Sequence, residues 1–134
     1  MVLGFAIRFV VSFVLTQVIG MFYYAPRVLG TIWANALGLT GDRMKEAQKH
    51  AAWTFSWATI GAVVLCLLWG TVLTYATVGS RLGAVEISLL AGFVCSAAGL
   101  SHYMFSQAGL KVWLIDLVHT ILTFAAIGAV FYTQ

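Results

Sequence analysis

Four polar side chains that could do chemistry follow one another at helical spacing near the end of the chain. Asp116, His119, Thr120 and Thr123 stand at positions i, i+3, i+4 and i+7, so they share one face of a helix. The residues around them are apolar, and an acid inside a membrane span costs about 2.5–3.5 kcal/mol on insertion scales. We therefore expect Asp116 to face a polar partner or water.

A second histidine is expected near this face. His102 precedes a short turn at residues 107–109, and Asp116 follows the turn. In an antiparallel helical hairpin the two positions lie at similar depth, which predicts a contact between His102 and Asp116. His50, at the entrance of another apolar segment, is expected on the same side of the membrane.

Three interpretations of this polar cluster of His102, Asp116, His119 and Thr120 differ in what the side chains do. The favoured one is structural, since buried polar groups in membranes bond to one another and hold helices together. The second is a proton or ion relay, because histidine titrates near neutral pH. The third, a metal or haem site at His50, His102 and His119, is favoured least, because no two histidines have a tight ligand spacing.

The composition places these residues in a membrane. Hydrophobic residues make up 62% of the 134 residues, charged residues only 8%, and the mean hydropathy is +0.98. Seven basic and four acidic side chains are too few to give a chain of this length a water-soluble surface. Lipid must therefore replace water over much of the surface.

Four apolar segments are long enough to cross about 30 Å of hydrocarbon as helices. They predict an all-α integral membrane protein, a single four-helix bundle over residues 1–134 with spans at about 3–24, 51–77, 84–105 and 111–132. Residues 28–49 form an interfacial and polar helical segment in the first loop. Its apolar part, 28–37, is too short to span and predicts a helix lying in the interface. Its polar part predicts a solvated helix that continues without a break into the second span.

The third span is enriched in small residues that let helices approach closely. Ser88, Gly92 and Ser96 recur at every fourth position, and Gly99 belongs to a second such row. We expect these residues to pack against other helices, with the third span at the centre of the bundle.

The basic residues are distributed unevenly between the two sides of the membrane. The first loop carries four Lys or Arg residues and the third loop contributes Lys111, whereas the opposite side has only Arg8 and Arg81. The positive-inside rule then places loops 25–50 and 106–110 on the cytoplasmic or matrix side and both termini outside. The membrane would be a bacterial cytoplasmic or a mitochondrial inner membrane.

Two charged residues near the outer surface are expected to pair. Arg8 in the first span and Glu86 in the third lie close to that surface, and an interhelical ion pair would lower the cost of both charges. In the alternative interpretation, Arg8 or Arg81 contacts a lipid phosphate.

The end of the first span carries a recognisable pattern. An aromatic-Tyr-x-Pro run is followed by a Gly, a Trp and a Gly-Leu pair, here Tyr24, Pro26, Gly30, Trp33, Gly38 and Leu39. Together with the hairpin sequence of residues 102–116, this resembles domain-of-unknown-function family 1761, small and mostly bacterial four-span membrane proteins. The resemblance covers nearly the whole chain and implies no reaction and no catalytic residues.

No pattern in the sequence indicates an enzyme. The chain has no phosphate-binding glycine loop, nucleophile elbow or paired-cysteine motif, and its basic residues form no stripe that would bind nucleic acid. The first hypothesis is a non-catalytic small subunit that packs into and stabilises a larger membrane assembly, such as a respiratory-type complex, with the bilayer and other integral membrane subunits as partners. We expect bound phospholipid and no other cofactor. The second hypothesis is a small homo-oligomeric transporter of ions, protons or solutes that uses the face of Asp116, His102 and His119.

Overall fold

The computed structural model describes residues 2–76 and 78–132 and is built from four long apolar helices. These are α1 (Val2–Tyr23), α4 (Ala51–Tyr75), α5 (Arg81–Phe105) and α6 (Gly109–Phe131). All four are long and apolar enough to cross a membrane. A helix satisfies its backbone hydrogen bonds internally, which is what a chain surrounded by hydrocarbon requires. The predicted all-α membrane fold with four spans is confirmed.

The first loop contains three short helical segments. They are η1 (Pro26–Gly30), a π-helix, followed directly by α2 (Thr31–Ala36) and, after a turn, by α3 (Gly41–Lys49). Pro26 starts the first of them because it has no N–H to leave unpaired. Gly38, between α2 and α3, and Gly41, the first residue of α3, have φ angles of 69° and 53° that favour glycine.

The prediction that the polar helix continues without a break into the second span is wrong. The chain turns at His50, which has φ −99° and ψ 5°. Its N–H bonds to the carbonyl of Ala47 three residues earlier, a tighter bond than that of an α-helix. This tight turn ends α3 before α4 begins.

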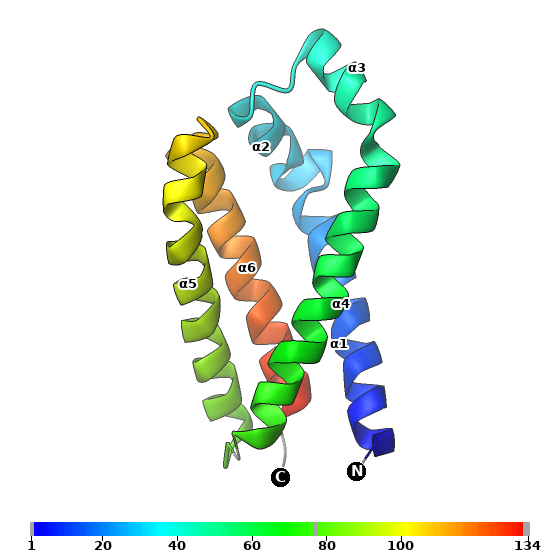
Figure 1. The fold of residues 1–134 in the computed structure, drawn as a ribbon, viewed down its shortest axis with the longest axis vertical. Helices are drawn as coiled ribbons and strands as arrows, with labels where there is room; N and C mark the ends of the chain where they lie inside the picture. The colour runs from blue at the N-terminus through cyan, green and yellow to red at the C-terminus, as the bar shows by residue number, and fades with distance from the viewer. Residues whose placement is uncertain (1, 77, 133–134) are drawn as a thin grey trace.

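The two ends of the bundle carry different parts of the chain (Figure 1). The N-terminus, the C-terminus and the turn between α4 and α5 lie at one end, whereas α3 and the turn between α5 and α6 lie at the other. We call the first the terminal end and the second the α3 end.

The small residues of the third span predicted that this span, α5, would lie at the centre of the bundle. The prediction is wrong, because the centre is α6. The helix α6 contacts α1, α2, α4 and α5. It contributes large side chains such as Phe124, Ile127 and Phe131 to the buried core. The small residues of α5 form a surface against which α6 packs, so α5 itself lies at the edge of the bundle.

The helices α5 and α6 approach each other closely. A Cβ atom added at Gly128 of α6 would lie 2.7 Å from the backbone oxygen of Ala84 and would also meet the Ser88 side chain. At Gly92 of α5, an added Cβ would lie 3.2 Å from the Cα atom of Ile121. The small residues therefore set the distance between these two helices.

Candidate functional site

The carboxylate of Asp116 accepts three hydrogen bonds from side chains in three other parts of the chain. Tyr24 Oη lies 2.5 Å and Trp33 Nε1 3.0 Å from its Oδ1 atom, and Tyr103 Oη lies 2.9 Å from its Oδ2 atom. Tyr24 follows the end of α1, Trp33 belongs to α2 and Tyr103 to α5. We call these four residues the Asp116 cluster. It joins α6 to three separate parts of the chain.

Local hydrogen bonds hold the members of this cluster in place. The Oη atom of Tyr23 donates to the backbone oxygen of Ile115 at 2.8 Å, which attaches the end of α1 to α6 one residue before Asp116. Thr120 donates to the backbone oxygen of Asp116 itself, also at 2.8 Å. The aromatic rings of Tyr24 and Trp33 meet edge to face with their centres 5.4 Å apart.

The donors suit an ionised carboxylate, because hydrogen bonds to a charged acceptor are stronger than neutral ones. The pKa of Tyr24 is raised by burial and, next, by its hydrogen bond to Asp116. The phenol therefore keeps its proton and remains a donor at neutral pH. A half-buried acid with three donors is a satisfied hydrogen-bond network, which gives the side chain a defined position.

His119 lies one turn further along α6, beside the cluster but not bonded to it. Its ring centre is 5.5 Å from that of Tyr23 and 5.0 Å from that of Tyr24. Its Nε2 atom is buried and has no hydrogen-bond partner among the residues that the structure describes. The atom faces α1 at Gly20, where an added Cβ would lie 3.5 Å away.

Further polar groups continue inward from His119 between α1 and α6. Ser12 Oγ and Thr123 Oγ1 are buried and also find no partner within residues 2–76 and 78–132. Thr16, 5% exposed, donates to the backbone oxygen of Phe13 and lies 4.0 Å from the sulfur of Cys66. Ser12, Thr16 and Thr123 are therefore buried polar side chains in an otherwise mostly apolar core.

Comparison with known protein families identifies one family that matches most of the chain. The family model described as a protein of unknown function, DUF1761, matches residues 7–132. This chain belongs to the DUF1761 family. The match includes all four residues of the Asp116 cluster. Comparisons with curated proteins and with solved structures find no match.

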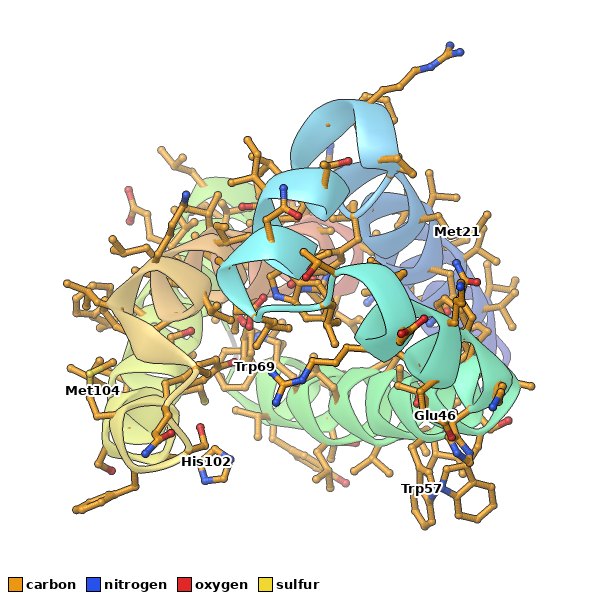
Figure 2. The ribbon with its side chains drawn as sticks, turned by 90° about the horizontal axis from the view of Figure 1, so that it is seen from above. Met21, Glu46, Trp57, Trp69, His102 and Met104 are labelled. Carbon is orange, nitrogen blue, oxygen red and sulfur yellow. The ribbon has the colours of Figure 1, made fainter. Side chains whose placement is uncertain are left out.

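The predicted contact between His102 and Asp116 does not form. His102 is exposed, and its ring centre lies 6.3 Å from that of its neighbour Tyr103. Adjacent residues on a helix point about 100° apart, so when Tyr103 faces Asp116, His102 cannot. Figure 2 shows the His102 imidazole at the rim of the bundle beside α5.

The three histidines lie in different surroundings. His50, between α3 and α4, is exposed, and its Nε2 atom is 3.5 Å from Glu46 Oε1. His102 is exposed on α5, whereas His119 has its ring among the tyrosines at the end of α1. In the described part of the chain, no three His, Cys, Asp or Glu side chains are grouped so that they could hold a metal ion.

The predicted ion pair between Arg8 and Glu86 is also not formed. Glu86 is exposed, two residues from both Ala84 and Ser88, which face α6. Two residues on a helix are about 200° apart, so Glu86 points away from the bundle. Arg8 instead lines a pocket with Arg81.

The residues expected to pack helices have different surroundings. Ser88 and Gly92 are buried against α6, and Ser88 Oγ accepts a hydrogen bond from Trp69 Nε1 of α4 at 2.9 Å. Ser96 is half-buried, and its backbone oxygen accepts a bond from Trp113 Nε1 at 2.8 Å. Gly99 is half-buried, and the nearest atom to an added Cβ would be in the Tyr103 ring of its own helix, at 3.8 Å.

Sequence reasoning missed the three donors to Asp116. It used Tyr24 as part of the family pattern, placed Trp33 in an interfacial helix, and gave Tyr103 no role. The available signal was their chemistry, because tyrosine and tryptophan carry O–H and N–H groups that need acceptors when buried. Asp116, an acid expected at a similar depth in the membrane, was a suitable acceptor for these groups.

Proposed function

We propose that this protein is a non-catalytic, small integral membrane subunit that packs into a larger membrane assembly and stabilises it. The observation that carries the proposal is the first half of α4. Ten consecutive residues, 52–61, are all exposed. Ten residues cover every side of a helix, so on no side is this part of α4 packed closely against the other residues that the structure describes. Figure 1 shows α4 leaning away from α5 and α6 toward the α3 end.

The inward face of α4 continues into this free half. Cys66 and Gly70 are buried against the rest of the bundle. Thr59, Phe55 and Ala52 lie 7, 11 and 14 residues before Cys66 and so fall on the same face. Phe55 is 70% exposed although it lies on this inward face. A helix of a partner subunit would complete the packing that the chain begins near the terminal end.

The two faces of free α4 differ in chemistry. The outward face carries bulky apolar side chains, including Trp57, Val64 and Leu68, which suit lipid. Figure 2 shows Trp57 pointing away from the other helices. The inward face carries Ala52 and Thr59, residue types that let helices approach closely in membranes, on either side of the bulky Phe55. This difference supports a transmembrane helix, rather than lipid, as the occupant.

The Asp116 cluster supports a structural role as well. The acid that the sequence singled out for chemistry bonds to three donors of its own chain. These bonds attach the first loop to α6 and so give the α3 end a defined shape. A subunit that has to fit a fixed partner needs such a preorganised surface.

We also propose the orientation of the chain in its membrane. The α3 end carries Arg27, Lys111 and the basic residues of α3, whereas the terminal end carries Arg8 and Arg81. This imbalance supports the α3 end on the cytoplasmic or matrix side of a bacterial cytoplasmic or mitochondrial inner membrane.

Site-specific photocrosslinking in the native membrane tests the proposed partner. The photoreactive residue p-benzoylphenylalanine is placed at Thr59, on the inward face, or at Trp57, on the outward face. We expect position 59 to give one discrete adduct with another membrane polypeptide, identified by mass spectrometry, and position 57 to give none. Adducts of position 59 with lipid only, or equal adducts from both positions, would contradict the proposal.

One observation favours a second candidate function, a small homo-oligomeric transporter of protons, ions or solutes. Ser12, His119 and Thr123, which come from α1 and α6, carry buried polar atoms without hydrogen-bond partners among the residues that the structure describes. Such groups could bind water or a cation in passage. An adduct of position 59 with a second copy of the chain, together with flux in liposomes that His119→Ala abolishes, would favour this function over the first.

A further inference from the structure

Two arginines from distant parts of the chain line one pocket at the terminal end. Arg8 of α1 and Arg81, the first residue of α5, share a pocket of about 400 Å³ with Val130 and Tyr132. The pocket thus lies where α1, α5 and α6 begin or end, on the side of the molecule that carries both chain ends (Figure 1). Arg8 is half-buried and Arg81 exposed, so the pocket opens to the surroundings.

The position of Arg81 is fixed by its neighbours. Its guanidinium carbon lies 5.3 Å from the centre of the Tyr132 ring, a cation–π arrangement. Ser80 caps α5 by accepting a hydrogen bond from the N–H of Gly83 at 3.0 Å. The start of α5 adds its partial positive charge to that of the arginine.

No carboxylate in residues 2–76 and 78–132 forms an ion pair with either arginine. Glu86, the acid of α5, is exposed and points away from the bundle. Asp116 is bound by its three donors, and the remaining two acids lie in α3 at the other end. Two like charges that face one pocket in a medium of low dielectric repel each other unless an anion lies between them.

We propose that this pocket binds the phosphodiester headgroup of an anionic phospholipid. Guanidinium groups match phosphate oxygens with pairs of hydrogen bonds, and the pocket stands at the end of four apolar helices, at the depth where headgroups lie. Val130 provides an apolar wall for the first carbons of the lipid. The site rests on the membrane fold alone and does not depend on the proposed function.

Lipid binding to the purified full chain in detergent tests this site. The probe is phosphatidylglycerol, with phosphatidylcholine as the zwitterionic comparison, and bound lipid is counted by native mass spectrometry during titration. We expect one phosphatidylglycerol to bind at least tenfold more tightly than phosphatidylcholine. Arg8→Gln and Arg81→Gln should each weaken that binding about tenfold. Arg27→Gln, which removes an exposed arginine at the α3 end, should leave it unchanged.

Three results would overturn the assignment. The first is equal binding of the two lipids, and the second is equal binding by the Arg8, Arg81 and Arg27 variants. The third is binding of inorganic phosphate as tight as that of phosphatidylglycerol, which would make free phosphate the ligand. If a glutamine variant does not fold, Arg8→Lys and Arg81→Lys replace it. The lysine variants keep the charge and lose the paired donors, so we expect their affinity for phosphatidylglycerol to fall only about threefold. An unchanged affinity for this lipid would again contradict the proposed site.

Discussion

The hydroxyl of Tyr24 lies 2.5 Å from the carboxylate of Asp116, although 92 residues separate them in the chain. This contact joins the end of the first span to the last span near the α3 end of the molecule. It places the start of the first loop against α6 and brings Trp33 within reach of the same oxygen atom. The carboxylate of Asp116 is therefore bonded to aromatic side chains, and His102, which was expected beside it, is not a partner.

Asp116→Asn should destabilise the protein by about 2–3 kcal/mol, because hydrogen bonds to a charged acceptor are worth more than neutral ones. The new amide group would also point N–H donors at side chains that are themselves donors. Unfolding by sodium dodecyl sulfate in detergent micelles, followed by circular dichroism, measures the change. The control is Asp42→Asn, since the Asp42 side chain is 98% exposed and pairs only with Lys45 in α3. Equal stability of the two variants would contradict the structural role of Asp116.

The stability of the protein should fall at high pH because of Tyr24. Burial and the bond to Asp116 raise the pKa of this phenol above its ordinary value of 10.0. The stabilisation is complete below the pKa of the unfolded chain and is lost as pH rises from there toward the folded-state value, since only the unfolded phenol ionises in that range. Unfolding free energies measured between pH 9 and 11 should decline more steeply for the wild type than for Tyr24→Phe.

The comparison between these two proteins removes the contributions of all the ionisable groups that the two share. Tyr75→Phe serves as a second control, because Tyr75 is 82% exposed. Its pH dependence should match that of the wild type. A Tyr24→Phe protein with the same decline as the wild type would mean that Tyr24 does not donate to an acceptor in the folded state.

Gly128→Ala should weaken the packing of α5 against α6 by about 1–3 kcal/mol. The added Cβ would lie 2.7 Å from the backbone oxygen of Ala84, so the two helices must move apart. Gly61→Ala is the matched control, since an added Cβ there has nothing within 4 Å. That change should be neutral or stabilise α4 by up to about 1 kcal/mol, because alanine favours helix over glycine. Thermal unfolding in detergent compares the two, and equal effects would contradict the close approach at Gly128.

The two histidines of the hairpin should respond differently to removal. His119→Ala leaves a cavity between α6 and the tyrosines at the end of α1, and we expect a loss of about 2 kcal/mol. His102→Ala should change the unfolding free energy by less than about 0.5 kcal/mol, because the side chain is exposed. A larger loss for His102→Ala than for His119→Ala would show that His102, and not His119, is the packed residue.

Hydropathy and length were enough to predict four membrane helices, because hydrocarbon allows apolar segments of about 20 residues hardly any other structure. The same reasoning identified Asp116 as a residue in need of partners, since the cost of a charge in lipid does not depend on the fold. It could not name those partners. Whether Tyr103 or His102 faces Asp116 depends on the rotation of α5, and a difference of one residue turns a side chain by about 100°.

The rotation and neighbours of each helix are set by packing across the whole bundle. Gly128 against Ala84 and Ser88 fixes how α5 meets α6, and this same contact turns Tyr103 inward and Glu86 outward. It also explains why Arg8 does not form an ion pair with Glu86 of α5, since α6 rather than α5 occupies the centre of the bundle. The membrane class of the protein thus followed from its composition. Its site was decided by the contacts between helices, because each such contact joins residues far apart in the chain.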